Sequence, residues 1–390
     1  MIVKNESHII EKTLNNICQY IDLDYWVICD TGSTDNTVEI IKNFFKSKNI
    51  KGEILYEPWV NFEHNRNVAL KACLGKAEYV LIFDADDQFS GEFVLPPLDK
   101  DSYFLKLCSE DGTTRYLRKI LIKNDGCFAW KGVLHEFLEE NRPITTGEIV
   151  GDYAVVSGRK GARSLDPNKY RKDAEMLKEA FLLNKDLAMQ PRYAFYCAQS
   201  YRDAKQIKEA MIWYQKRIEI DLGWSEEIYC SYEQLGLLFE EQGQYSQAIE
   251  TWQKGILFDH TRAECWYHIA RRHSWNEHPI LAYCFASQSI QIAQPTGNRL
   301  FINTAIYQYW CWYEYTLNAA KLEKFQDAYY GLKSLIEYAP IDLLDYLTPY
   351  YVHMHPYLVL DRFDQVAKIG TFFRQNQRND LFNLLLNGKS

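Results

Sequence analysis

The chain places three carboxylates within four residues, in the segment Asp84-Ala85-Asp86-Asp87. This segment follows the apolar run Tyr79–Phe83, which reads YVLIF and is typical of a buried strand. Carboxylates placed side by side repel each other unless a cation compensates them, and oxygen ligands of this kind suit Mg²⁺ or Mn²⁺. The alternative is a set of solvated turn residues and helix caps. We favour a divalent-cation site that holds a diphosphate.

A second polar segment follows another short apolar run. Tyr25–Cys29 (YWVIC) is too short for a helix and ends at Asp30. The next residues, Thr31–Thr37, offer hydroxyl and carboxylate side chains that can cap a following helix with Val38 and Phe45 on its apolar face. This order predicts a strand, a polar turn and a helix, the unit of a parallel sheet.

The same alternation continues over the first 160 residues. Ile54–Tyr56 is a further expected strand and Asn65–Cys73 a further helix, while Tyr103–Cys108 and Tyr116–Lys123 indicate an antiparallel pair. Ligands of such sheets bind beyond the carboxyl ends of the strands, so Asp30 and the Asp84 segment should meet at one edge. Met1–Val3 is short for a central strand, which leaves open a truncated edge or a start farther upstream.

From about residue 167 the strand signals give way to a repeat of small residues. Ala198, Gly236 and Ala270 are each followed twelve residues later by alanine, and the segment Tyr232–Trp252 resembles the tetratricopeptide pattern. Each repeat would be a helical hairpin that buries its apolar stripe only by stacking on its neighbours. We expect domains at 1–160 and 167–345, with a helical cap at 346–390.

The N-terminal motifs resemble glycosyltransferase family two, the inverting GT-A group. The resemblance rests on Ile2–Glu6, Asp30–Thr37, Arg66-Asn67 and Asp84–Asp87, in that order and spacing. It implies an α/β domain of the GT-A type, Rossmann-like with a mostly parallel sheet, followed by an all-α tetratricopeptide-like domain. With the segment Gly161–Pro167, the chain is also similar to bacterial peptide S-glycosyltransferases of that type.

The resemblance also assigns roles to single residues. Asp30 and Thr31 would face the uridine of a UDP-sugar, although many relatives have a second aspartate where this chain has Thr31. The remaining donor residues would be Asn5 and Glu6 at the nucleotide pocket, Arg66 at the base or diphosphate, Asp84 at the ribose or the waters of the metal, and Asp86 as a direct ligand of Mn²⁺ or Mg²⁺.

The segment Trp130–Phe137 matches the place where relatives carry acceptor-side catalytic residues. In an inverting transfer one carboxylate near the acceptor suffices as the base, and Glu136 is the candidate. His135 would contact the metal or the diphosphate. The alternative is a loop histidine beside a surface glutamate. Where relatives often carry a further histidine this chain has Val156–Lys160, and Arg159 or Lys160 would neutralise the diphosphate instead.

Composition limits the classes of function. The 390 residues carry a formal net charge of −8, which argues against electrostatic binding of nucleic acid over an extended surface. No apolar run is long enough to span a membrane, no signal peptide is evident, and ten scattered cysteines without a C-x-x-C motif indicate reduced thiols, so we expect a cytoplasmic protein.

Two functions compete. The first is a metal-dependent inverting glycosyltransferase that moves a sugar from a UDP-sugar, or another nucleotide-diphosphate sugar, to a peptide, protein or glycan acceptor. A homodimer is a further expectation. The second is a catalytically degenerate binding protein that assembles partners through its helical repeats.

Overall fold

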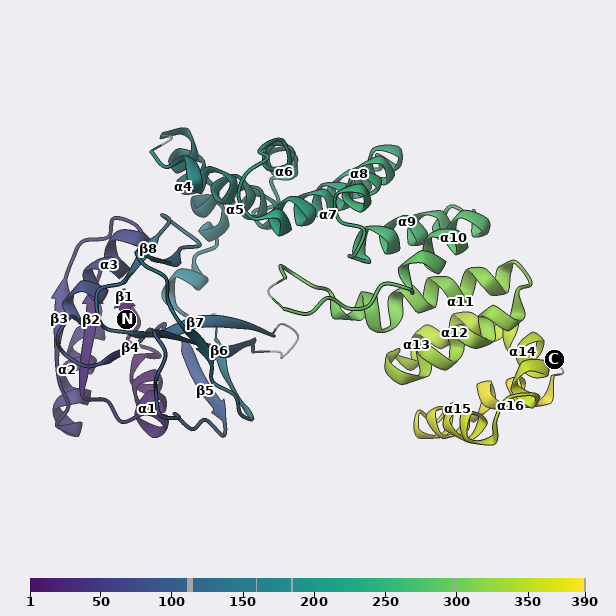
Figure 1. The fold of residues 1–390 in the computed structure, drawn as a ribbon, viewed down its shortest axis with the longest axis horizontal. Helices are drawn as coiled ribbons and strands as arrows, with labels where there is room; N and C mark the ends of the chain where they lie inside the picture. The colour runs from purple at the N-terminus through teal and green to yellow at the C-terminus, as the bar shows by residue number, and fades with distance from the viewer. Residues whose placement is uncertain (111–114, 159, 184, 298, 389–390) are drawn as a thin grey trace. The chain divides into compact units, whose positions relative to one another are not determined.

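The structure, a computed structural model, describes residues 1–110, 115–158, 160–183, 185–297 and 299–388. It divides into two compact units, Met1–Gln206 and Ile207–Ser390. The first unit begins with an α/β domain that contains parallel strands, and the described chain after residue 157 is helical apart from its loops (Figure 1). The expected order of fold classes is therefore confirmed. The three-domain division stays a prediction, since the first unit extends past residue 160 by a pair of helices.

The first sheet is parallel and has the strand order β1-β2-β3. Its strands and the helices that follow them are β1 (Ile2–Val3), α1 (Ile10–Tyr20), β2 (Tyr25–Asp30), α2 (Thr37–Lys48), β3 (Lys51–Tyr56) and α3 (Phe62–Ala72). The predicted elements all form. Ile28 of β2 packs with Ile10 of α1 and with Ile41 and Phe45 of α2, whereas α3 packs against β2 and against β8 (Phe128–Lys131).

The second sheet is mixed and has the order β4-β7-β6-β11-β5, with β10 paired to β6. Its strands are β4 (Tyr79–Leu81), β5 (Asp87–Gly91), β6 (Ser102–Ser109), β7 (Arg115–Lys123), β10 (Thr146–Glu148) and β11 (Tyr153–Ser157). The expected antiparallel pair is β6 with β7. Strand β4 ends two residues before the predicted Phe83, although Ile82 N still donates to Ile120 O. The hairpin β8 (Phe128–Lys131) with β9 (Phe137–Glu140) was not predicted.

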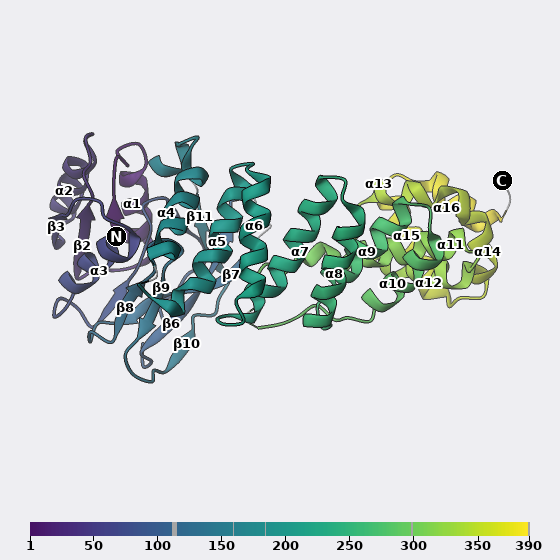
Figure 2. The same cartoon turned by 90° about the horizontal axis from the view of Figure 1, so that it is seen from above.

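The helices after the sheets pack largely as neighbouring pairs. Their bounds are η1 (Ala162–Leu165), α4 (Lys169–Leu183), η2 (Leu187–Met189), α5 (Gln190–Asp203), α6 (Ile207–Glu219), α7 (Ser225–Glu241), α8 (Tyr245–Phe258), α9 (Glu264–Trp275), α10 (Pro279–Ser289), η3 (Ile306–Trp310), α11 (Cys311–Lys321), α12 (Phe325–Tyr338), α13 (Ile341–Leu344), η4 (Asp345–Tyr350), α14 (Tyr351–Val359), α15 (Phe363–Gln375) and α16 (Asn379–Asn387). Figure 2 shows α7 beside α8 and α9 beside α10, and these pairs are in contact.

The repeated small residues lie where paired helices touch. A Cβ atom added to Gly236 of α7 would lie 2.1 Å from Trp252 Nε1 of α8, so only glycine allows this approach. Ala248, Ala270 and Ala282 are fully buried in α8, α9 and α10. The twelve-residue spacing therefore reports a helix-pair contact, as the sequence indicated. Among the described residues, no helix is both long enough and apolar enough to cross a bilayer.

Candidate active site

Asp30 is the last residue of strand β2 and Thr31 follows it, and both are almost fully buried. The Asp30 carboxylate accepts hydrogen bonds from Gly32 N at 3.3 Å and Ser33 N at 3.2 Å. Thr31 Oγ1 donates to Val3 O at 3.1 Å. These contacts shape the loop at the carboxyl end of the parallel sheet. Contact of either side chain with a uridine stays a prediction.

Asn5 and Glu6 lie on the turn after β1 and bind two different loops. Asn5 has the positive φ of 58°, and its Oδ1 accepts from Thr34 N at 2.7 Å. Glu6 Oε2 accepts from Ala162 N at 3.1 Å, and burial, with a further contribution from the charge of Asp86, raises the pKa of Glu6. The turn thus joins the β2 loop to the segment that enters α4.

Asp86 and Glu6 converge on Gly161. Asp86 Oδ2 accepts from Gly161 N at 3.1 Å, and a Cβ atom on Gly161 would lie 3.3 Å from carboxylate oxygens of both residues. A side chain at this position would therefore make tight contacts with both carboxylates, which glycine avoids. Asp86 is half-buried, so its carboxylate is within reach of a ligand that enters from solvent.

Asp84 is bound by two arginines. Arg66 Nη2 lies 2.8 Å from Asp84 Oδ1, and Arg118 Nη1 of β7 lies 3.2 Å from Asp84 Oδ2. Burial alone would raise the pKa of Asp84, but the two guanidiniums outweigh it and hold this pKa well below its usual range. Asp84 is therefore a permanent anion near neutral pH, and its position is set by both cations.

Arg66 also reaches the acceptor-side loop. Its Nε lies 2.6 Å from Glu136 Oε1, and the two side chains are 7% and 8% exposed. Trp130 lies with its ring centroid 5.0 Å from the Arg66 guanidinium carbon, and Phe62 covers the same group at 5.8 Å. The structure thus brings together Arg66, Asp84 and Glu136, three of the residues singled out from the sequence.

Asp87 starts strand β5, where the sequence indicated only a turn, and pairs in register with Ser157 of β11. It is 4% exposed. Burial, together with the negative charges of Asp84 and Asp86, raises the pKa of Asp87 to about 7, against the opposing charge of Arg118. A carboxyl group that titrates near neutral pH can act as a base or an acid.

His135 is placed by the helical part of the first unit. Its ring stacks on Tyr196 of α5 with centroids 3.9 Å apart and an interplanar angle of 12°. Desolvation and the nearby charges of Arg192, Arg163 and Lys169 hold the pKa of His135 well below its usual value. Within the described ranges, no group of three or more His, Cys, Asp or Glu side chains is arranged to hold a metal ion. The assignment of His135 to a metal stays a prediction.

The sequence missed two residues that build this centre. Arg118 was missed because β7 skips Ile120 in its pairing with β6, and this irregularity breaks the alternation that would reveal which face a residue occupies. Asn67 donates to Trp130 O and accepts from Trp130 N, each at 2.8 Å, and so ties α3 to β8. The Arg66-Asn67 motif pointed to this position in the sequence, but a binding role was assigned from the sequence to Arg66 alone.

Lys160 and Arg159 were expected to neutralise a diphosphate. Lys160 Nζ forms an ion pair with Glu110, and both side chains are 59% exposed. Arg159 lies outside the described residues.

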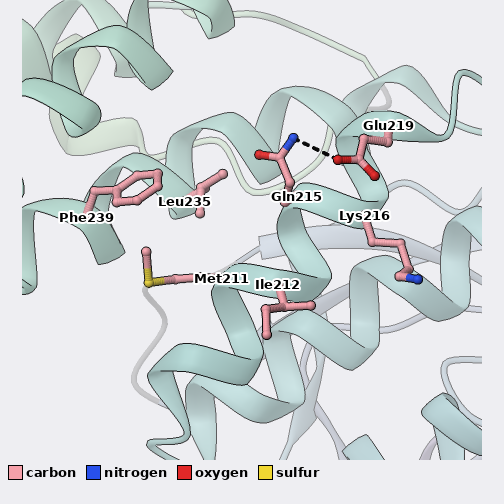
Figure 3. Close-up of a pocket in the computed structure, with 7 residues that line it drawn as sticks. All are labelled: Met211, Ile212, Gln215, Lys216, Glu219, Leu235 and Phe239. Atoms are coloured by element: carbon pink, nitrogen blue, oxygen red, sulfur yellow. Dashed lines mark hydrogen bonds between the residues drawn. The ribbon is translucent and has the colours of Figure 1, made fainter.

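A groove in the second unit is separate from these residues. Figure 3 shows it between α6 and α7, lined by Met211, Ile212, Gln215, Lys216, Glu219, Leu235 and Phe239. Gln215 Nε2 donates to Glu219 Oε1 at 3.2 Å along α6. The groove holds none of the carboxylates assigned to chemistry.

The motifs at the strand ends coincide with a known family. Residues 1–100 match glycosyl transferase family 2. The family 2 match spans β1 to β5 and includes Arg66, Asp84, Asp86 and Asp87, whereas Arg118 and Glu136 lie beyond it.

Two curated relatives align with part of the chain. The SPbeta prophage-derived glycosyltransferase SunS of Bacillus subtilis (strain 168) and the glycosyltransferase SunS of Bacillus phage SPbeta are each 38% identical over 93 residues. The match covers 24% of this chain and 20% of each relative, so the chain spans about a fifth of the length of the curated relatives it matches.

Solved structures align with a larger share of the chain at lower similarity. YrrB, described as a TPR protein with an unusual peptide-binding site, aligns with a TM-score of 0.37 at 16% identity, over 55% of this chain and 97% of its own. The MamA protein aligns with a TM-score of 0.36 at 15% identity, over 49% of this chain and 96% of its own. At these scores neither alignment supports a conclusion about this chain.

Proposed function

We propose that the chain is a metal-dependent glycosyltransferase that moves a sugar, with inversion, from a UDP-sugar to a peptide, protein or glycan acceptor. The observation that carries the proposal is the placement of Arg66, which lies 2.8 Å from Asp84 and 2.6 Å from Glu136. One buried cation thus joins the carboxylate assigned to the donor with the carboxylate assigned to the acceptor. The match of residues 1–100 to glycosyl transferase family 2 supports the same activity.

The donor would bind at the carboxyl ends of the strands. Asp84 is fixed there as an anion by Arg66 and Arg118, which suits a hydrogen bond to a ribose hydroxyl. Arg118 is 29% exposed and Arg66 is 7% exposed, so Arg118 is the more accessible cation for a diphosphate. We assign Asn5, Glu6, Asp30 and Thr31 to the nucleotide pocket on the strength of the motif they form.

Asp86 is the side chain we assign to the divalent cation. Proteins usually hold Mg²⁺ through one or two carboxylates together with substrate phosphates, so a site of this type needs no cluster of three protein ligands. The half-buried Asp86 carboxylate, with Glu6 beside it at Gly161, fits that donor set. A bound cation would neutralise the charge that develops on the leaving diphosphate.

The transfer needs one base on the acceptor side. The acceptor atom forms its bond to the anomeric carbon while the bond from that carbon to the diphosphate oxygen breaks, and the electron pair leaves with the diphosphate. We assign the acceptor's proton to Glu136, whose carboxylate Arg66 holds in place. Asp87 is the second candidate for this base, because burial and the neighbouring carboxylates raise its pKa to about 7.

The repeats in the second unit favour a peptide or protein acceptor. Helix α7 contacts α8 and helix α9 contacts α10. Stacked helix pairs of this kind can present extended surfaces that bind extended chains. A glycan acceptor would instead be recognised within the first unit.

A thermal-shift panel of UDP-sugars with and without Mn²⁺, followed by a UDP-release assay, tests the proposal. We expect one donor to raise the melting temperature only when Mn²⁺ is present, and to release UDP with turnover. The Asp86→Ala variant serves as the control and should lose both responses. No response of the wild-type protein to any donor would favour the scaffold function.

A further inference from the structure

The loop that carries Glu136 is held by two different helices. On one side lies α3: Gly132 N donates to Glu63 Oε2 at 2.6 Å, and Phe62 N donates to Val133 O at 3.2 Å. Both residues of α3 that make these contacts, Phe62 and Glu63, lie in the segment that matches family 2. They hold the start of the loop and leave His135 and Glu136 to be held by other groups.

On the other side lies α5, more than fifty residues farther along the chain. Arg192 Nε donates to His135 O at 2.8 Å, and Val133 N donates to the hydroxyl of Tyr193 at 3.3 Å. The ring of Tyr196 covers the His135 imidazole at 3.9 Å. Three residues of one helix therefore contact two positions of the loop, Val133 and His135, and all of them belong to the first compact unit.

Arg192 links these contacts to one another. Its guanidinium carbon lies 4.9 Å from the ring centroid of Tyr196 and 5.4 Å from that of Phe137. The same side chain thus contacts the carbonyl before Glu136, the ring beneath His135 and the ring after Glu136. Lysine could reach the carbonyl, but it has no planar group that could stack on the two rings.

The backbone of the loop needs such support. His135 has the positive φ of 53°, in the left-handed region that residues with a Cβ atom seldom adopt. A residue persists there only when its surroundings determine it. The turn at His135 brings the next residue, Glu136, to 2.6 Å from Arg66. The conformation of His135 therefore fixes the direction of the proposed base.

We propose that Arg192 is a positioning residue for the sugar transfer, an inference that rests on the proposed function. It holds His135 in its left-handed conformation and so keeps Glu136 against Arg66. The α4–α5 helix pair is then a working part of the transferase site and more than a connection to the repeats. In this assignment His135 serves through its carbonyl and its stacked ring.

The test compares Arg192→Ala and Arg192→Lys in the full chain with the matched control Arg171→Ala. Arg171 lies on α4 of the same unit, is 61% exposed and pairs with Glu175. For each protein we would measure UDP affinity by calorimetry, kcat and KM for UDP release from the donor found in the panel, and hydrogen exchange of a peptide covering 131–137.

For Arg192→Ala we expect kcat to fall at least tenfold, with UDP affinity and donor KM within twofold of wild type and faster exchange over 131–137. Arg192→Lys should recover part of kcat, and Arg171→Ala should match the wild type. A merely structural role would speed hydrogen exchange over 131–137 and leave kcat unchanged, which would overturn the inference. An inactive wild type would instead overturn the proposed function.

Discussion

Arg66 Nε lies 2.6 Å from Glu136 Oε1 while Arg66 Nη2 lies 2.8 Å from Asp84 Oδ1, so one nearly buried guanidinium serves two carboxylates. No hydrogen bond of good geometry to Arg66 Nε is found among the described residues, so charge and proximity hold the contact with Glu136. A buried ion pair adds little net stability, but removal of one partner leaves the other charge buried and unpaired.

Arg66→Met should therefore destabilise the first unit by about 3 to 5 kcal/mol. The double variant Arg66→Met with Glu136→Leu should recover part of that loss, because the carboxylate left unpaired is then absent. Urea unfolding of the four members of this mutant cycle measures the coupling. Additive effects of the two substitutions would show that the 2.6 Å contact carries no interaction energy.

The second prediction separates the two candidate bases. Glu136→Gln keeps the shape of the side chain but cannot take a proton, so kcat should fall by about 10² to 10⁴-fold while donor affinity stays nearly unchanged. Asp87→Asn is the matched comparison and should lower kcat less. Steady-state UDP release measures kcat for both variants. A near-normal kcat in Glu136→Gln together with a large fall of kcat in Asp87→Asn would assign the base to Asp87 instead.

Asp86→Ala should abolish Mn²⁺-dependent donor binding and transfer but leave the fold intact, since the side chain is half-buried and its carboxylate accepts a hydrogen bond from the backbone N of Gly161. Its melting temperature without ligand should lie within a few degrees of the wild type. Asp24→Ala, an exposed aspartate before β2, is the control and should keep the Mn²⁺ response. Global unfolding of Asp86→Ala, seen by circular dichroism, would argue against a role confined to the ligand.

Much of this site was predictable, and the reasons for the rest are physical. The apolar runs and their polar ends located β2, β4, Asp30, Asp84 and Asp86. The expected common edge of one parallel sheet was wrong, because β2 lies in the first sheet and β4 pairs antiparallel with β7 in the second. The contact of Arg66 with Glu136 was not predictable, since it depends on hairpin β8–β9 and on a left-handed turn at His135. The contacts of Arg192 and Tyr196 in α5 with His135 join residues more than fifty positions apart, and no local sequence pattern reveals such contacts.

Glu314 of α11 gives a prediction about pH in the second unit. It is 3% exposed, and burial raises its pKa from 4.5 to about 7, against the charges of Arg271 and Lys321 and hydrogen bonds from Ser274 and Asn318. Between these two values the folded state holds a proton that the unfolded state has lost. The free energy of unfolding should therefore fall as the pH rises from about 5 to 8.

Glu314→Gln should remove this pH dependence, with little change at pH 5 and a gain of about 1 to 3 kcal/mol at pH 8. Urea unfolding followed by circular dichroism at pH 5, 6.5 and 8 measures it. Glu337→Gln is the control, because Glu337 is 43% exposed and pairs with Lys368. Equal pH slopes for the wild type and Glu314→Gln would show that Glu314 titrates at an ordinary pKa.

The last prediction concerns where the transferase part ends. The predicted boundary at residue 160 would place α4 and α5 with the repeats, whereas the compact unit runs from Met1 to Gln206. A fragment 1–206 retains Arg192 and Tyr196 at the turn of His135, and a fragment 1–166 loses both.

We expect the longer fragment to unfold cooperatively and to bind UDP within about tenfold of the full chain. The shorter fragment should be less stable and exchange amide hydrogens over 131–137 more quickly, because its loop is held by α3 alone. Calorimetry with UDP and hydrogen exchange on both fragments would decide, and equal behaviour of the two would place the working boundary near residue 160 after all.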